Sequence, residues 1–489
     1  MWTDRWAPDR RAARLALALA LLATAVAAPA AEAAPADVTF EAETMSLPAA
    51  NGGNGNDATA SGGAAKLIWS NGAATKDVTT TRSSIHLFVR ARGDACEGDA
   101  RISVKIGAKE WYAGPVSSAG WAWIGTRISI PAGTHTVSIA FTNDHSASTL
   151  LGSCDRNAWI DQVTVVATPF RADGWRNAPL ADDAPIKSNS AVLRDELKDQ
   201  VQDSLDKPSS PENAGTWVNT SSYAAPVYVV PPGQPTVRVD DPQDRTALQA
   251  QWDNVPLPAD AQPASGTDSE LTVYQPSTNT IWDFWQLRKD LLGNWAASYG
   301  GRMTNAHLHE GHFEDPPIGP GRGYGATATS IAFLAGLQRI EEIRRGVIDH
   351  AVDFGVTAPR GRDGWCWPAQ RTDRKLTSRA PEAIPAGTRF RLPASLNIDA
   401  LPITPYAKIL AKAVQKYGMV ARDSAGLVTF YAENWGPTGS DPYGSLFGGP
   451  PNARPGGALA NFPWDQLQVI EQPSGADRGC QDDPDVEVP

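Results

Sequence analysis

The sequence predicts a mainly β fold: an N-terminal antiparallel β-sandwich of the jelly-roll type and a larger, mostly-β (α+β) C-terminal domain. Short segments of alternating apolar and polar residues, separated by Gly- and Asn-rich turns, fill residues 37–168 and are typical of a sandwich. In residues 190–475, apparent strands outnumber apparent helices. A chain of 489 residues is also too long for one small core, so two domains are expected.

Residues 1–36 have the layout of a secretory signal peptide. A basic start that includes Arg10 and Arg11 precedes an apolar run from Leu15 to about Ala28, and small residues follow. The apolar run is shorter than the ~20 residues that a membrane-spanning helix needs. We therefore expect a secreted, extracellular protein that does not associate with membranes and whose cysteines form disulfides.

The charge of the chain argues against nucleic acid as a partner. The formal net charge is -11, and the sequence has no long basic stretch that would displace counterions from a phosphate backbone. The 17 tryptophans suit either a large β-rich core or surfaces that stack on flat apolar ligands. We expect a monomer.

Local patterns divide the chain further. In the sandwich, strands are predicted at "DVTFEAETM", "SSIHLFVRARG", "GTHTVSIAFTND" and "NAWIDQVTVV". Residues 169–189 are rich in Pro, Ala and Asp and are expected to form a linker, and residues 476–489 are expected to form a disordered tail. Between them, helical spacing marks residues 190–205 and "PYAKILAKAVQKYG", whereas "TIWDFWQ" and "GVIDHAVDF" are predicted to be strands.

The four cysteines suggest two disulfides. Cys96 and Cys154 lie in two turns of the predicted sandwich, and a bond between them would stiffen the loop that follows Cys154. Cys366 and Cys480 remain, and they either pair or stay apart, because Cys480 lies in polar tail sequence.

The first domain resembles a known family of sugar-binding sandwiches. "FEAETM", "RARGDACEGDARISVKI", "AGTHTVSIAFTND" and "CDRNAWIDQVTV" are similar to the calcium-dependent xylan-binding carbohydrate-binding modules of families 36 and 60. The resemblance spans nearly all of residues 37–168 and implies a sandwich that binds xylan or a related β-glycan through Ca²⁺. In the C-terminal sequence, "IWDFW", "GATATS", "GVIDHAV", "WPAQRTD", "GTRFRL" and "KYGMVARD", spread over about residues 265–471, resemble a group of secreted bacterial proteins that offers no catalytic assignment.

Two sets of oxygen-bearing side chains suit Ca²⁺, which takes about six to eight oxygen ligands. Glu41 and Glu43 are two residues apart and share one strand face, and Asp161 meets them if the first and last strands pair. In related sandwiches a structural calcium often lies there. The alternative is that these acids are ordinary strand and turn residues.

The second set lies near the predicted Cys96–Cys154 disulfide and consists of Asn143, Asp144 and Asp155. In the resembled families a calcium ion in this region contacts sugar hydroxyls directly. Asp155 and Asn157 are therefore also predicted to contact the glycan.

The stretch "NAHLHEGHFED" contains His307, His309 and His312 with a spacing that zinc hydrolases use. Gly311 stands where the β-lactamase type of zinc hydrolase has an Asp, and no buried strand leads into the motif. A polar or substrate-lining loop is the preferred interpretation, so Zn²⁺ is not expected here.

Candidate catalytic groups of the C-terminal domain are Asp283, Glu433 and His350. Asp283 is bracketed by aromatic residues, which suits a general acid in a sugar cleft. His350 is either a base or a satisfied core histidine, and Glu433 would supply a second carboxylate. Predicted substrate contacts are Trp282, Trp285, Trp365, Trp367, Arg371, Arg389 and Arg391.

These observations predict a secreted glycoside hydrolase that degrades xylan or another plant-wall polysaccharide, with an appended binding module. The C-terminal assignment rests on the association of such modules with enzymes and not on a motif. The alternatives are a non-catalytic glycan-binding or adhesion protein and a polysaccharide lyase. No G-x-S-x-G motif, phosphate loop or dinucleotide fingerprint is present in the sequence.

Overall fold

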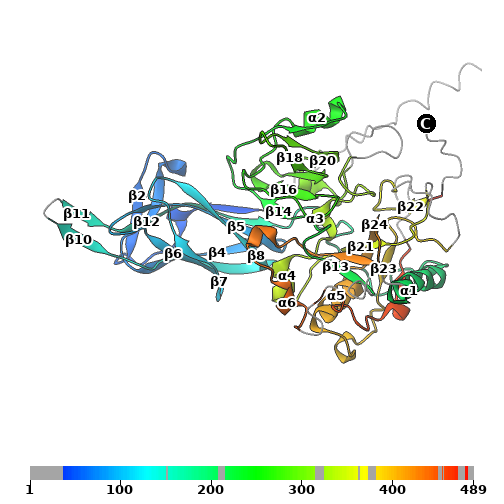
Figure 1. Ribbon diagram of the computed structural model, residues 1–489. Helices are drawn as coiled ribbons and strands as arrows, with labels where there is room; N and C mark the ends of the chain where they lie inside the picture. The colour runs from blue at the N-terminus through cyan, green and yellow to red at the C-terminus, as the bar shows by residue number, and fades with distance from the viewer. Residues whose placement is uncertain are drawn as a thin grey trace, which may run out of the picture. The chain divides into compact units, whose positions relative to one another are not determined.

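The computed structural model describes residues 37–149, 152–206, 215–313, 324–361, 364–372, 382–449, 454, 456–471 and 480–482. The predicted signal peptide and most of the predicted tail lie outside the described residues. Figure 1 shows the sandwich strands in blue and cyan, followed by green to orange elements in which strands and short helices alternate. The predicted fold class, mainly β with an N-terminal antiparallel sandwich, is confirmed.

The sandwich is built from two antiparallel sheets. One sheet has the order β2 (Gly52–Asn56), β3 (Ala64–Ile68), β12 (Asn157–Ala167), β5 (Ser84–Asp94) and β8 (Ala122–Ile130), and β1 (Val38–Glu41) also pairs with β12. The other has the order β4 (Gly72–Thr80), β9 (Gly133–Phe141), β6 (Arg101–Ile106) and β7 (Lys109–Pro115). Apolar residues such as Val163 and Ile139, from opposite sheets, share one core, as expected when inward positions alternate.

The first and last strands of the sandwich pair, which is the condition under which Asp161 was expected to approach Glu41 and Glu43. The two glutamates do not share a strand face as predicted, because β1 ends at Glu41 and Glu43 lies in the 3-10 turn Ala42–Thr44. Glu41 of β1 lies opposite Gln162 of β12 in an antiparallel register. A separate hairpin of β10 (Ser146–Thr149) and β11 (Gly152–Asp155) precedes β12. β5 is an inner strand of its sheet, because it pairs with β12 along one edge and with β8 along the other.

The C-terminal region contains two principal sheets. The larger has the order β13 (Trp217–Asn219), β25 (Thr429–Tyr431), β21 (Val352–Val356), β24 (Met419–Ser424), β23 (Arg389–Arg391) and β26 (Gln468–Val469). The other has the order β14 (Val227–Val229), β16 (Leu271–Gln275), β17 (Thr280–Trp285) and β20 (Tyr299–Met303). Smaller pairings join β15 (Val239–Asp240), β19 (Trp295–Ala296) and β18 (Arg288–Lys289), and β22 (Gly364–Cys366) with β27 (Cys480–Asp482). Cys366 lies opposite Cys480 in the last of these pairings, and the two form the second disulfide, which the sequence leaves open.

Helices occupy short parts of the C-terminal region. They are α1 (Ser190–Asp206), α2 (Thr246–Trp252), α3 (Phe333–Gly336), α4 (Ile340–Arg345), α5 (Pro405–Lys416) and α6 (Tyr443–Leu446). The helices predicted from spacing at residues 190–205 and in "PYAKILAKAVQKYG" correspond to α1 and α5 and are confirmed. The sequence also predicts that part of "IAFLAGLQRIEEIRRG" is helical, and α3 and α4 lie there. Thr404 caps α5 by accepting a hydrogen bond from the Ala407 backbone at 3.0 Å, and Pro405 takes the first helical position. No helix of the described part of the chain is long and apolar enough to cross a membrane.

Two local predictions differ from the structure. The strand predicted for "GVIDHAVDF" begins only at Val352, so His350 lies before β21 and the expected alternation of faces does not apply to it. β17 is a strand as predicted, but both of its faces are buried, since every residue from Thr280 to Phe284 is buried. Asp283 therefore does not face solvent on either side.

The beginning of the segment predicted to be a linker is packed, whereas residues 177–189 are half-buried or exposed. Phe170 and Trp175 are buried in one core with Ile85 and Phe88 of the sandwich and with residues of the C-terminal region. The Arg127 side chain of β8 also donates to Glu433 at 3.0 Å. These contacts all lie within the compact unit that begins at Ala36.

Candidate functional site

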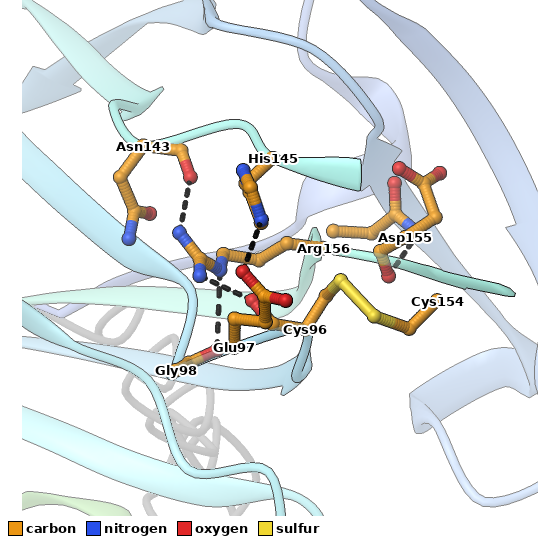
Figure 2. Close-up of a disulfide and its surroundings, with 9 residues drawn as sticks. Cys96, Glu97, Gly98, Asn143, His145, Cys154, Asp155 and Arg156 are labelled. Atoms are coloured by element: carbon orange, nitrogen blue, oxygen red, sulfur yellow. Dashed lines mark hydrogen bonds and ion pairs between the residues drawn. A yellow bond between two sulfur atoms is a disulfide. The ribbon is translucent and has the colours of Figure 1, made fainter. Parts of the chain in front are cut away.

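A disulfide anchors the loops at the β10–β11 end of the sandwich. Cys96 is bonded to Cys154 of β11, across a sequence separation of 58 residues, as predicted. Beside it, the buried Arg156 side chain donates to the carbonyl oxygens of Gly98 at 3.1 Å and Asn143 at 2.9 Å, and also to that of Cys96 (Figure 2). One guanidinium therefore joins three loop carbonyls and holds the end of the sandwich in a fixed conformation.

The oxygen-bearing side chains at this end of the sandwich differ in how many hydrogen bonds and ion pairs they already make. The Asn143 amide is used inside the loop, since its Oδ1 accepts from Arg101 N at 2.7 Å and its Nδ2 donates to Asp99 O at 3.0 Å. Glu97 pairs with His145 at 3.0 Å. The Asp155 side chain is exposed, and in Figure 2 its carboxylate points away from Asn143. Of the predicted calcium ligands Asn143, Asp144 and Asp155, Asn143 therefore fits least well, because its side-chain oxygen already accepts a hydrogen bond.

The second expected calcium set lies around the 3-10 turn Ser61–Gly63. Glu41 accepts from the Ser61 hydroxyl at 3.1 Å, and Asp161 accepts from the Ser61 backbone at 2.9 Å. Asp161 also pairs with Arg90. Burial is the largest influence on Asp161 and raises the pKa of its carboxyl group, with Arg90 acting in the opposite direction.

Two oxygens near this turn fit a cation. Glu41 Oε2 and Glu43 Oε2 are buried, and neither has a hydrogen-bond partner among the described residues. No group of three His, Cys, Asp or Glu side chains in the described ranges is gathered as a metal site. The carboxylates that fit Ca²⁺ would therefore need carbonyl or water oxygens to complete its shell.

A large cleft opens in the C-terminal region. Its volume is about 890 Å³, and its wall carries the aromatic side chains of Trp217, Tyr223, Trp285, Tyr299 and Tyr431. Ring faces of this kind stack on the apolar faces of sugars. The charged residues of the wall are Asp268, Glu270, Asp423 and Arg371.

Strand register explains why these residues meet. Leu271 of β16 lies opposite Phe284 of β17, so Glu270, one residue earlier, comes beside Trp285 at the same edge of the sheet. Trp285 lies opposite Tyr299 of β20. Asp423, near the end of β24, and Tyr431 of β25 reach the cleft from the larger sheet.

Glu270 is the buried acid of the cleft. Its side chain is 6% exposed, and its Oε2 atom has no hydrogen-bond partner in the part of the chain that the structure describes. Burial raises the pKa of the Glu270 carboxyl group to about 8. Asp268, Asp423 and Asp283 raise it further, and Arg422 opposes them. At neutral pH, Glu270 is therefore mainly a neutral carboxylic acid with a proton to give.

Arg422 lies next to the cleft and orders its aromatic wall. Its guanidinium pairs with Asp353 at 2.9 Å and lies 3.7 Å from the centre of the Tyr431 ring. Arg371 donates to the carbonyl oxygens of Gly325 and Thr327 at 2.9 and 2.7 Å, which ties the 325–327 loop to the cleft wall.

Among the residues predicted to contact substrate in the C-terminal region, Trp285 and Arg371 line the cleft. The cleft is not lined by the other predicted substrate contacts of this region. It is also not lined by any of the three predicted catalytic groups. Asp283 is fully buried and accepts hydrogen bonds from Thr272 Oγ1 at 2.5 Å and from Phe333 N at 2.8 Å. Burial raises the pKa of its carboxyl group to about 6.

The two other predicted catalytic groups also have structural partners. His350 is buried, with Nε2 at 3.1 Å from Glu342 and Nδ1 at 2.7 Å from the carbonyl of Ala351. Glu433 is buried between Arg127, at 3.0 Å, and Arg339, at 3.5 Å. Their side chains join elements of the fold instead of facing the cleft.

The predicted arginine and tryptophan contacts outside the cleft serve packing. Arg389 donates to the carbonyls of Tyr417 and Trp175, and Arg391 donates to that of Ala181. Trp282 is buried and donates to the Gln251 carbonyl. Trp367 is buried in the core and Trp365 is half-buried on β22.

The three histidines of "NAHLHEGH" are also outside the cleft lining. Burial lowers the pKa of His307 to about 4. His309 accepts a backbone hydrogen bond from Arg171 N at 2.8 Å, and His312 forms a bridge with Ile331. This loop packs against residues near 170 and holds part of the fold together.

Glu270 and Asp423 are cleft residues that were not predicted from the sequence. Each stands at a strand end, Glu270 directly before β16 and Asp423 within the last two residues of β24. The detectable signal was "TDSELTVYQ", where acids precede an apolar strand. The predicted acid, Asp283, lies inside strand β17, which is buried on both faces, so substrate cannot reach it.

Residues 86–174 match the family model of the CBM60 family, described as a calcium-dependent, xylan-binding carbohydrate-binding module. The match supports a carbohydrate-binding module in the N-terminal sandwich, and it ends inside the segment that the sequence predicted to be a linker. No curated protein matches the chain.

Solved structures were also found to be similar. One is the CBM36-1 domain of a multidomain xylanase from the hindgut metagenome of Trinervitermes trinervoides, with 16% identity, coverage of 26% of this chain and 95% of that chain, and a TM-score of 0.21. Another is a CBM36 module in complex with calcium and xylotriose, with 17% identity, coverage of 26% and 97%, and a TM-score of 0.21. A β-(1,4)-mannanase from Podospora anserina has 17% identity, coverage of 35% and 36%, and a TM-score of 0.23.

Proposed function

We propose that this protein is a secreted glycan-degrading enzyme. Its sandwich binds a xylan-like polysaccharide through Ca²⁺, and its C-terminal region hydrolyses a plant-wall glycan. The observation that carries the proposal is the joint presence, in one chain, of a match to xylan-binding modules and of an aromatic cleft with several carboxyl groups. Aromatic rings beside carboxyl groups are the elements of a glycosidase site.

The sandwich offers oxygens for Ca²⁺ in two places. The exposed Asp155 carboxylate lies beside the disulfide, where rigid loops would present a bound ion to sugar hydroxyls. The buried Glu41 and Glu43 oxygens would hold a second, structural ion. A bound Ca²⁺ supplies an electrophilic centre that sugar hydroxyls can coordinate.

Retention of the full-length protein on insoluble xylan tests the calcium role. We expect retention in buffered CaCl₂, release in EDTA, and restored retention when excess CaCl₂ is added back. Asp155→Asn should weaken retention, and Trp285→Ala, a change in the cleft, should leave the calcium-dependent part of retention unchanged. Equal retention with and without EDTA would exclude calcium-dependent binding.

Product release from a panel of plant-wall glycans tests the catalytic role. We expect new reducing ends from xylan or a related β-glycan. Products that absorb in the unsaturated-uronate band would instead identify a lyase. If no glycan yields product, the chain is a binding protein with two glycan surfaces and the hydrolase proposal is wrong.

A further inference from the structure

We propose that the cleft binds a neutral β-glycan chain and that Glu270 is the general acid that protonates its glycosidic oxygen. This inference rests on the proposed hydrolase function. It goes beyond that function by naming the proton donor, its place in the fold and the charge class of the substrate.

The position of Glu270 places its carboxyl group where a ligand can reach it. It is a carboxyl group that is more than nine-tenths buried, it lines a large open cleft, and its Oε2 atom has no protein partner within the described residues. An unsatisfied buried polar atom is costly for a fold. A ligand oxygen at this position would accept a hydrogen bond from the protonated acid and remove that cost.

The groups around Glu270 favour the protonated form of its carboxyl group. Burial raises the pKa of Glu270 most, Arg422 opposes this rise, and Asp268, Asp423 and Asp283 reinforce it. Asp268 and Asp423 line the same cleft, and Asp283 lies on the neighbouring strand β17. Arg422 is itself paired with Asp353, so its charge is already compensated. The surroundings therefore keep the proton on Glu270 at neutral pH, which suits a proton donor.

The charge of the cleft identifies the class of substrate. Among the lining residues, Asp268, Glu270 and Asp423 carry carboxyl groups, whereas Arg371 carries the cationic group. Even with Glu270 neutral, acids outnumber bases among the lining residues that the structure describes. A polyuronate would be repelled by such a wall, whereas a neutral chain would stack on Trp285 and the neighbouring rings.

The chemical step balances with water as the co-reactant. Glu270 gives its proton to the glycosidic oxygen while the bond from the anomeric carbon to that oxygen breaks, and the leaving sugar departs as an alcohol. A water molecule forms the new bond to the anomeric carbon, and its proton passes to one of the half-buried carboxylates, Asp268 or Asp423. Solvent then returns a proton to Glu270 and removes one from the base.

Activity of Glu270→Gln tests the acid. Gln is nearly isosteric and neutral, like the protonated acid, so folding should be preserved. On a glycan that the wild type hydrolyses, we expect kcat to fall about a hundredfold or more, with KM little changed. The wild-type rate should decline above pH 8, and the variant should lose this decline. Asp283→Asn is the matched control, because Asp283 is a buried neighbouring acid that does not line the cleft, and it should keep the decline.

A near-normal rate for Glu270→Gln, or an unchanged alkaline decline, would overturn the acid assignment while the hydrolase proposal stood. Calorimetric binding of xylohexaose to the full chain in EDTA tests the cleft separately, because EDTA removes calcium-dependent binding by the sandwich. We expect Trp285→Ala to weaken this remaining binding about tenfold or more, and an oligogalacturonate not to bind. Absence of xylohexaose binding in EDTA, or equal binding by the variant, would refute the cleft as a neutral-glycan site whether or not activity is found.

Discussion

Replacing Glu433 with Gln should destabilise the protein without a direct effect on chemistry. The Glu433 side chain is completely buried, lies 3.0 Å from Arg127 and 3.5 Å from Arg339, and accepts a hydrogen bond from Ile340 N at 3.3 Å. Arg339 is itself only 1% exposed, so the amide would leave its guanidinium with less compensating charge in a dry environment. Removal of one partner from such a buried set typically costs about 3–5 kcal/mol.

Urea denaturation followed by tryptophan fluorescence measures this loss. We expect Glu433→Gln to unfold at a clearly lower urea concentration than the wild type. Glu97→Gln is the control, because its pair with His145 is solvent-exposed, and it should unfold with the wild type. If Glu433→Gln kept the wild-type midpoint but lost glycan hydrolysis, the structural role would be wrong and a catalytic role for Glu433 would be restored.

Three further outcomes are expected. The double replacement of Cys96 and Cys154 by Ser should lower the free energy of unfolding by about 4 kcal/mol, from chain entropy over the 58-residue separation, and an unchanged thermal midpoint would contradict this. Burial raises the pKa of Glu270 from 4.5 to about 8, so the stabilisation from its protonated carboxyl group is full below pH 4.5 and is lost as the pH rises through 8. In denaturation curves, Glu270→Gln should therefore gain stability relative to the wild type between pH 5 and pH 9. Gly387→Ala should lower the free energy of unfolding by at least about 2 kcal/mol in the same assay, because φ is +81° at Gly387 and a Cβ would lie 1.7 Å from the Cys366 carbonyl oxygen. Wild-type stability of this variant would show that the position is not strained.

The sandwich could be predicted from the sequence because its strands alternate with a period of two and face one core. β5 and β12 show this directly, and the Cys96–Cys154 disulfide followed from the positions of two turns in the same domain. Helices α1 and α5 were predicted for the same kind of reason, since each buries one stripe of apolar residues.

The cleft could not be assembled in the same way. Trp285 and Arg371 were identified by residue type, but the choice of Asp283 assumed that one face of β17 is open, and β17 is buried on both. What makes Glu270 unusual is its burial, together with the electrostatic influence of Arg422 and Asp423, which are more than 150 residues away along the chain. Such a convergence depends on tertiary structure and leaves little trace in local sequence.

The packed residues Phe170 and Trp175, which follow the sandwich directly, limit how readily the sandwich can be transferred to another protein. Many appended modules can be exchanged between proteins by recombination at a flexible junction. Here a cut after residue 168 would remove Phe170 and Trp175 from a core that they share with Ile85 and Phe88, and would expose those apolar side chains to water. A transplanted sandwich would therefore have to carry these two residues or cover the same face with new residues. Evolutionary exchange of the domain is constrained by the same requirement, so the two halves are expected to be inherited together.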